Sequence, residues 1–218
     1  MRVKHTNIYT YAELSDDAKA KARDWYREAS AGDDFFAESV TEDFKEAAKA
    51  CGLELSGRNP NNRGDKGIYW SGFSSQGDGA SFTASWSASR VDVAAILKDR
   101  PATYTDRNGV QQTCEGNAKL APILEGFAEL ADLDREAYGS TVAGRGHYQT
   151  DTDYDSEHVT HSDVADERAA TLKELCSDLA HWFYRTLERE YEYQNSDAVV
   201  AEAITCNEYE FTADGECA

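Results

Sequence analysis

Residues 81–88 read Ser-Phe-Thr-Ala-Ser-Trp-Ser-Ala, a strict alternation of polar and apolar side chains. Because successive side chains of a strand point to opposite faces, the pattern predicts a half-buried strand with one polar face. Two further extended segments precede it, at residues 53–55 and 68–73, with turn residues at 59–62 between them. Three strands in succession indicate an antiparallel meander.

Helical patterns flank this block of strands. Ser15 is an N-cap candidate for a first helix that ends at Gly32, and apolar residues at helical spacing continue through a second helix over 33–51. After the strands, the same periodicity predicts helices at 91–97, 118–133, 163–194 and 197–205. Short extended pieces are expected on both sides of a turn at 106–109 and at 138–142, 146–154, 158–161 and 207–212.

The order of these elements is typical of the α+β class. We expect an antiparallel β-meander sheet, with the N-terminal helix pair and the long C-terminal helix packed on one face. The chain has only three prolines, no linker rich in Pro, Gly or Ser, and no internal repeat. These features predict a single α+β domain over residues 1–218.

The charge balance narrows the possible functions. Among 218 residues, 41 acids and 22 bases leave a net charge of -19, and residues 151–218 alone hold 18 acids and 4 bases. A chain this acidic lacks the basic footprint that direct nucleic-acid binding requires. We expect a basic protein partner instead. Two alternatives are that the acidity serves solubility or adaptation to a salty habitat.

The compartment follows from what the sequence lacks. It has no run of 18 apolar residues and no apolar stretch of a signal peptide after Met1. The chain has five cysteines, an odd number, and no CxxC pair. This pattern is typical of cysteines that stay reduced. We therefore expect a cytoplasmic protein of a bacterial host, without a membrane segment and without a cofactor.

The loop between the second and third predicted strands is the most distinctive local feature. Ser74, Ser75, Gln76 and Asp78 offer polar contacts among small residues that let a partner approach the backbone. The alternative is a hairpin connection, because Asp78-Gly79 suits a tight turn with positive φ. The loop lacks the Lys-Ser/Thr pair of a phosphate-binding P-loop.

A second candidate binding region lies near the end of the long predicted helix. Tyr191 and Tyr193 alternate there with Glu188, Glu190 and Glu192. Tyrosine is favoured at interfaces, and neighbouring carboxylates suit a basic partner. The alternative is an ordinary amphipathic helix.

A third region combines acids and histidines. Asp151, Asp153 and Asp155 begin like a calcium loop, but Ser156 and Ser162 stand where that motif requires Gly and Glu. On a strand, the three carboxylates form a polar stripe. A metal-dependent enzyme that uses His147, His158, His161 and nearby Asp residues is an alternative, although the spacing matches no established zinc motif.

Three segments of the chain resemble a family of small acidic phage and prophage proteins, some of which carry an antitoxin-like label. The matching segments are residues 11–26, with Glu-Leu-Ser-Asp-Asp-Ala-Lys; 69–80, with Ser-Gly-Phe-Ser-Ser-Gln-Gly-Asp-Gly; and 190–197 with 207–215, the latter reading Asn-Glu-Tyr-Glu-Phe-Thr-Ala-Asp-Gly. The resemblance implies a phage or prophage origin and brings no catalytic residue and no cofactor.

Together these features predict a non-enzymatic phage-type accessory protein that binds a basic host or phage protein through an acidic surface, as an inhibitor or a nucleic-acid mimic. The alternatives are an antitoxin or immunity-like partner of one toxin, and the metal-dependent enzyme.

Overall fold

A computed structural model describes residues 7–31, 34–57, 67–143, 150–159 and 161–218. The chain divides into two compact units: unit 1 comprises residues 1–39 and 189–218, and unit 2 comprises residues 40–188. The boundary falls within helices α2 (Phe35–Ala50) and α5 (Ser162–Gln194). The expectation of one domain over the whole chain stays a prediction.

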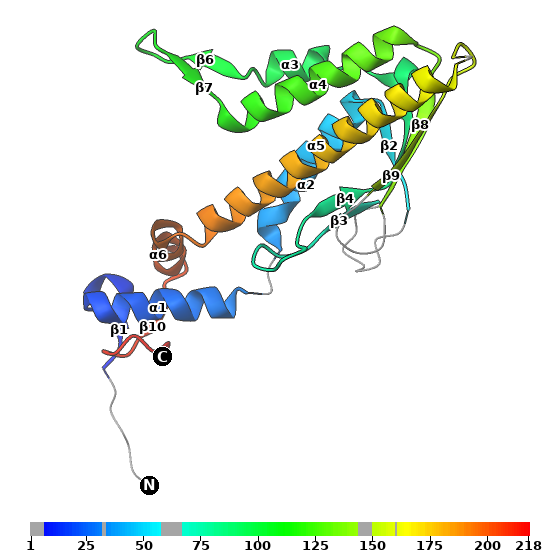
Figure 1. The fold of residues 1–218 in the computed structure, drawn as a ribbon. Coiled ribbons are helices and arrows are strands. Elements are labelled where there is room, and N and C mark those ends of the chain that lie inside the picture. The colour runs from blue at the N-terminus through cyan, green and yellow to red at the C-terminus, as the bar shows by residue number, and fades with distance from the viewer. Residues whose placement is uncertain (1–6, 32–33, 58–66, 144–149, 160) are drawn as a thin grey trace. The chain divides into compact units, whose positions relative to one another are not determined.

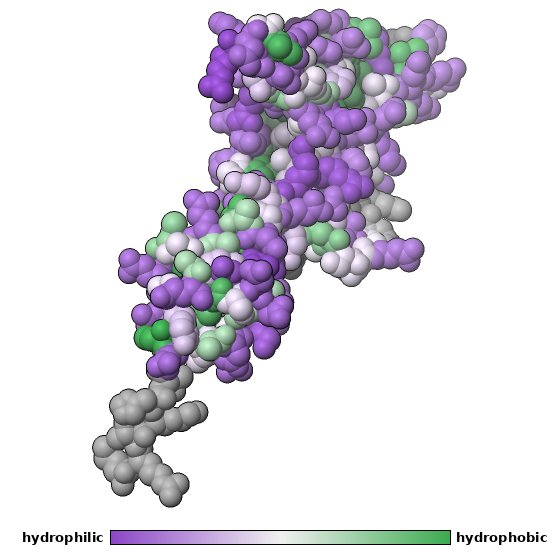
Figure 2. All heavy atoms as spheres, turned by 90° about the vertical axis from the view of Figure 1, so that its left-hand side faces the viewer, coloured by the Kyte–Doolittle hydropathy of each residue, from purple (hydrophilic) through white to green (hydrophobic). Residues whose placement is uncertain are grey.

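One face of the molecule is largely hydrophilic. On the face seen in Figure 2, hydrophilic residues predominate and hydrophobic ones occur in small scattered groups. Within the described part of the chain, no helix combines the length and apolar character that a membrane span requires.

Unit 2 is an α+β structure, as predicted. Figure 1 draws its elements and labels most of them. After the C-terminal part of α2 they are β2 (Leu53–Leu55), β3 (Ile68–Trp70), β4 (Ala80–Phe82), β5 (Ala84–Ser87), η2 (Ala88–Arg90), α3 (Ala94–Asp99), β6 (Thr103–Thr105), β7 (Gln111–Thr113), α4 (Glu115–Leu133), β8 (Tyr138–Ala143), β9 (Thr150–Asp155) and most of α5. The long C-terminal helix is therefore confirmed.

Helices α2 and α5 pack together on the sheet through aromatic side chains. The Phe44 ring lies 5.4 Å from that of Phe82 in β4 and 4.5 Å from that of Phe183 in α5, measured between centroids, and all three side chains are fully buried. Trp86 of β5 donates from Nε1 to the Cys51 carbonyl at 3.0 Å, which ties the sheet to the end of α2. The alternation at residues 82–88 thus places its apolar members against helices, as its period predicts.

The strand order differs from a simple meander. The main sheet is antiparallel in the order β2-β5-β8-β9, while β3 and β4 form their own hairpin. The reason lies at Thr83, between β4 and β5: its N–H donates to Gly67 O at 2.7 Å, and its C=O accepts from Ser56 N at 2.9 Å. The strand therefore changes partners at Thr83, from β3 to β2.

Other local predictions have mixed outcomes. The turn at 106–109 connects β6 and β7 as expected, with Gly109 at φ 80. The predicted strand at 158–161 is wrong: His158 lies in a turn that is closed by Val159 N–H, which donates to Ser156 O at 3.3 Å. The predicted turn at 59–62 and the helix stop at Gly32 lie outside the described residues.

Unit 1 has its own small core. Its elements are β1 (Tyr9–Thr10), η1 (Tyr11–Glu13), α1 (Asp16–Ala29), residues 35–39 at the start of α2, residues 189–194 at the end of α5, α6 (Asp197–Cys206) and β10 (Glu210–Phe211). Ala18 and Ala22 of α1 pack with Val200 and Ile204 of α6 and with Phe211. The first helix of the predicted N-terminal pair thus buries its small-residue face against α6, while α2 packs against the sheet.

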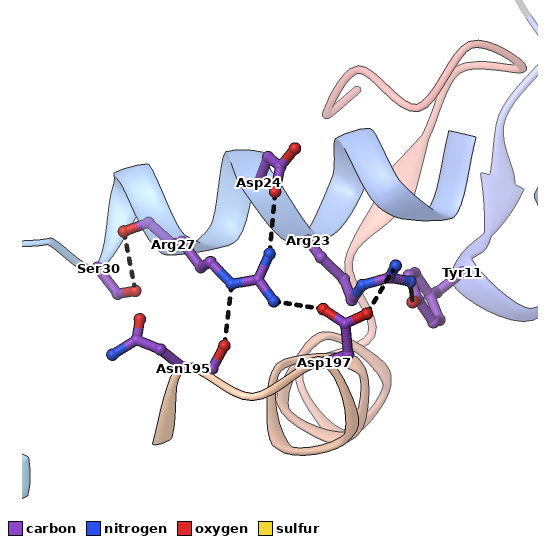
Figure 3. A network of polar contacts seen from close by, with 7 residues as sticks. All are labelled: Tyr11, Arg23, Asp24, Arg27, Ser30, Asn195 and Asp197. Atoms are coloured by element: carbon purple, nitrogen blue, oxygen red, sulfur yellow. Dashed lines mark hydrogen bonds and ion pairs between the residues drawn. The ribbon is translucent and has the colours of Figure 1, made fainter. Parts of the chain in front are cut away.

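A polar network joins α1 to the beginning of α6 (Figure 3). Asp197, in the first turn of α6, accepts from Arg27 at 2.5 Å and from Arg23 at 3.1 Å. Arg27 also donates from Nε to the Asn195 carbonyl at 3.0 Å. The arginines lower the pKa of Asp197, chiefly through the Arg27 hydrogen bond, and a helix N-terminus itself favours a carboxylate.

Candidate functional site: an acidic sheet face

The Asp stripe predicted from sequence lies on β9, at one edge of the main sheet. Asp151, Asp153 and Asp155 are exposed, whereas Tyr154 between them is buried. Each Asp pairs in register with a residue of β8: Asp151 with Val142, Asp153 with Ser140, and Asp155 with Tyr138. We call these six residues the acidic sheet face.

Two large side chains lie among the carboxylates. Tyr138 is 51% exposed and Val142 is 49% exposed, although both belong to an inner strand of the sheet. Figure 1 shows α2 and α5 on one side of β8 and β9. The exposed side chains of the acidic sheet face lie on the opposite side of these two strands. The acidic sheet face therefore combines charge with apolar contact area, and it includes a tyrosine, a residue type enriched at protein interfaces.

Hydrogen bonds hold two of the carboxylates in place. Tyr138 Oη donates to Asp155 Oδ2 at 2.9 Å, which raises the pKa of Tyr138, and Ser140 N–H donates to Asp153 Oδ1 at 2.5 Å. Within the described chain, no ion pair neutralises Asp151, Asp153 or Asp155. Their charge is thus oriented and remains available to an external cation.

Sequence reasoning missed Tyr138 and Val142 as candidate site residues. Both lie in an extended segment that was predicted, but only the register between β8 and β9 places them beside the three acids. Alternation within 138–143 shows which residues share a face, but it does not show which strand lies next to them.

The alternative metal site is not assembled in the described structure. His158 Nε2 lies 2.7 Å from Glu136 Oε2, within hydrogen-bond distance. This hydrogen bond is the main reason that the pKa of His158 is raised. His161 and Asp163 are exposed, and His147 lies outside the described residues. No group of three or more His, Cys, Asp or Glu residues suited to a metal ion occurs in the part of the chain that the structure describes.

The loop at 71–79 is organised by the Asp78 carboxylate. It accepts from Ser75 N–H at 2.6 Å, Ser74 N–H at 3.0 Å and Ser71 Oγ at 2.9 Å. All three hydrogen bonds lower the pKa of Asp78, and the bond from the Ser75 amide has the largest effect. Asp78 thus shapes the loop from within.

The same loop leaves other polar groups on the surface. Ser74, Ser75 and Gln76 are exposed. The loop connects β3 and β4, as the hairpin alternative expects. Its positive φ belongs to Gly77, at 103°, and not to Asp78 or Gly79 as the dipeptide pattern predicts. Asp78 instead turns its side chain back toward the preceding amides.

The residues predicted near the end of α5 do not form one strip. Glu188 and Glu190 are two positions apart, so a helix directs them to nearly opposite sides, whereas Glu188 and Glu192 share a side. Glu188 pairs with Arg185 at 2.6 Å, and Glu190 accepts from Gln194 at 2.7 Å.

The tyrosines of this region differ in their surroundings. The Tyr191 ring contacts that of Phe36 within unit 1, with centroids 5.5 Å apart, and its side chain is 43% exposed. Tyr193 is 60% exposed. Tyr184 lies about two turns before Tyr191 on α5 and belongs to unit 2. Its hydroxyl donates to the Gly72 carbonyl at 2.8 Å.

Comparison with known proteins gives one match. No curated protein and no solved structure matches the chain. A family model described as a domain of unknown function, DUF8835, matches residues 36–197, which include the acidic sheet face and all of unit 2. The chain therefore belongs to the DUF8835 family.

Proposed function

We propose that this protein is a non-enzymatic binding protein that holds a basic partner protein on the acidic sheet face. The observation that carries the proposal is the row of three exposed carboxylates, without a neutralising partner in the described chain, beside the exposed side chains of Tyr138 and Val142.

The physical argument has two parts. Carboxylates on a surface of an acidic protein attract a basic partner over about a Debye length, which accelerates encounter. Tyr138 and Val142 then supply contact area that excludes water around the charges. A surface with only the charges would steer a partner without retaining it.

The resemblance to phage and prophage proteins extends the proposal to biological role. A phage-type accessory protein of this kind would occupy the basic groove of a host protein that normally holds nucleic acid, and so act as an inhibitor or mimic. An antitoxin-like role is the variant in which the partner is one small basic toxin.

The test compares capture of host proteins by wild type and by a triple variant with Asp151→Asn, Asp153→Asn and Asp155→Asn. Each protein is immobilised, exposed to bacterial lysate, and washed at low and at high salt before mass spectrometry. We expect wild type to retain a basic protein at low salt and the variant to bind that protein roughly tenfold more weakly.

The matched control removes the same charge from helices of unit 2. The control variant carries Glu125→Gln, Glu129→Gln and Glu174→Gln, all at exposed positions of α4 and α5. Equal weakening by the two triple variants would show that net charge alone matters and would refute a role for the acidic sheet face.

The helix end predicted from sequence is a second candidate surface for the same partner, supported by the exposed Tyr193 and Glu192. Joint neutralisation of Glu188, Glu190 and Glu192 tests it. If affinity at low salt stays unchanged, this part of α5 does not contact the partner. The exposed Ser74, Ser75 and Gln76, with Asp78 behind them, are tested in the same assay by alanine substitution.

A further inference from the structure

A groove of about 850 Å³ lies along β2, the strand at the other edge of the main sheet. Its walls come from the C-terminal half of α2, from β2, which follows α2 directly in the sequence, and from the more distant segment from η2 to α3. The lining residues are Lys45, Glu46, Lys49, Ala50, Gly52, Leu53, Glu54, Leu55, Arg90, Asp92 and Ile96.

The backbone of β2 has free hydrogen-bonding groups on the groove side. Ser87 N–H donates to Gly52 O at 3.1 Å, and Ser56 N–H donates to Thr83 O at 2.9 Å, so Gly52, Glu54 and Ser56 face β5 in the alternating antiparallel ladder. Leu53 and Leu55 consequently direct one N–H and one C=O each away from β5. No residue that the structure describes hydrogen-bonds to these groups.

The groove also offers apolar surface beside this edge. Ala50 of α2 and Ile96 of α3 stand on either side, and the side chain of Leu55 is partly exposed. A volume of several hundred Å³ with a mainly apolar lining is typical of a site that binds a specific ligand.

On the α2 wall of the groove, the Lys49 ammonium can meet an acidic side chain of the occupant. Glu54 is paired with Arg90 at 2.6 Å, and Glu46 with Arg100 at 3.2 Å. Lys49, one helical turn after Lys45, is exposed and has no ion-pair or hydrogen-bond partner among the described residues. Asp92, from the segment between η2 and α3, also lines the groove and has no ion pair among the described residues, so the lining as a whole has no excess of positive charge. On the α2 wall, however, Lys49 is free to pair with an acidic side chain of the occupant.

The opposite edge of the sheet provides a contrast. Three unpaired carboxylates line β9, and charges of this kind discourage strand addition at a sheet edge. At β2 the single acid, Glu54, is neutralised by Arg90. The β2 edge therefore lacks the protection that β9 has.

We infer that the groove binds an extended peptide segment of a partner protein, which adds to the sheet as a strand beside β2, places apolar side chains against Ala50 and Ile96, and presents an acidic side chain to Lys49. Main-chain bonds to Leu53 and Leu55 would supply affinity, and the groove walls would supply specificity. This site is separate from the acidic sheet face and takes a ligand of opposite charge.

The first experiment selects peptides. A display library of random decapeptides is panned against wild type and counter-selected against Ile96→Asp, a variant that places a charge on the wall of the groove. We expect enriched sequences in which apolar residues alternate and at least one acid recurs. Absence of any enrichment that depends on Ile96 would overturn the inference.

The second experiment tests the binding mode with the leading synthetic peptide. Its binding should slow amide hydrogen exchange at Leu53 and Leu55, and N-methylation of its central residues should abolish binding. A peptide that binds without protecting these amides, or that tolerates N-methylation, would show an apolar side-chain site and not strand addition.

The third experiment is a charge exchange. Lys49→Glu should weaken binding of the acidic peptide about tenfold, and replacing the peptide's acid by Lys should restore part of that loss. Lys98→Glu is the matched control, because Lys98 is exposed on α3 outside the groove lining. Circular dichroism confirms that each variant is folded. Equal loss with both variants would contradict a specific contact at Lys49.

Discussion

At the scale of single residues, Asp134 anchors the end of the strand that carries the acidic sheet face. Asp134 follows α4, Ser156 follows β9, and each is only 8% exposed. Ser156 Oγ donates to Asp134 Oδ2, and Glu136 N–H donates to Asp134 Oδ1 at 3.0 Å. Both hydrogen bonds lower the pKa of Asp134, and the bond from Ser156 has the larger effect.

We predict that Asp134→Ala lowers the free energy of unfolding by about 1–3 kcal/mol at pH 7, because the Ser156 hydroxyl loses its buried partner. Since the folded-state pKa of Asp134 is lowered, its stabilising contribution is complete above the unfolded-state pKa of about 3.9 and is lost as pH falls through the folded-state pKa. Urea unfolding of both proteins between pH 7 and pH 3 measures the difference.

The control for this prediction is Asp132→Ala. Asp132 is exposed and contacts Arg135 at the surface, so its removal should change stability little. If the difference between wild type and Asp134→Ala were the same at pH 3 as at pH 7, the ionised form of Asp134 would not be the stabilising species.

At the scale of elements, unit 1 depends on the packing of α1 against α6. The contact uses small residues on α1, Ala18 and Ala22, so the two helices approach closely around Ile204, which is fully buried. The ion pairs of Arg23 and Arg27 with Asp197 lie at the more exposed side of the same contact. Because surface ion pairs contribute little, we attribute most of the stability of unit 1 to the apolar contact.

We predict that Ile204→Ala destabilises unit 1 by about 2–5 kcal/mol, the range for removing a fully buried aliphatic side chain. Amide hydrogen exchange in α1 and α6 would report the loss directly. Val199→Ala, at a partly exposed position of the same helix, should have a smaller effect. Equal acceleration of exchange by the two variants would argue against a core centred on Ile204.

At the scale of the whole molecule, the net charge of -19 governs behaviour in salt. Like charges on one molecule repel one another, and the repulsion acts over about 30 Å at 0.01 M salt but only about 8 Å at 0.15 M. The face seen in Figure 2 is largely hydrophilic.

We predict that the protein is folded at low salt and that its melting temperature rises by a few degrees as salt increases from about 20 mM to about 300 mM, because screening relieves the repulsion. Differential scanning fluorimetry across this range, with sucrose as an uncharged control, makes the measurement. Unfolding at low salt would instead support adaptation to a salty habitat as the reason for the acidity.

Much of the local structure could be predicted from the order of residues. Ser15 caps α1 as expected, accepting from Ala18 N–H at 3.4 Å, and the long helical pattern became α5 within one residue of its predicted start. The Asp stripe on β9 also followed from alternation alone. These features depend on periods of two and 3.6 residues, which operate over short stretches of chain.

Features built from distant segments could not be predicted in this way. The exchange of partners at Thr83, the position of Tyr138 beside Asp155, and the groove between α2, β2 and α3 all depend on which strand or helix lies alongside another. Periodicity assigns each side chain to a face of its own element but contains no information on the neighbour of that face. The carboxylates of this protein were therefore evident from its residues, while the surfaces that bring them together with apolar side chains arise from long-range pairing and packing.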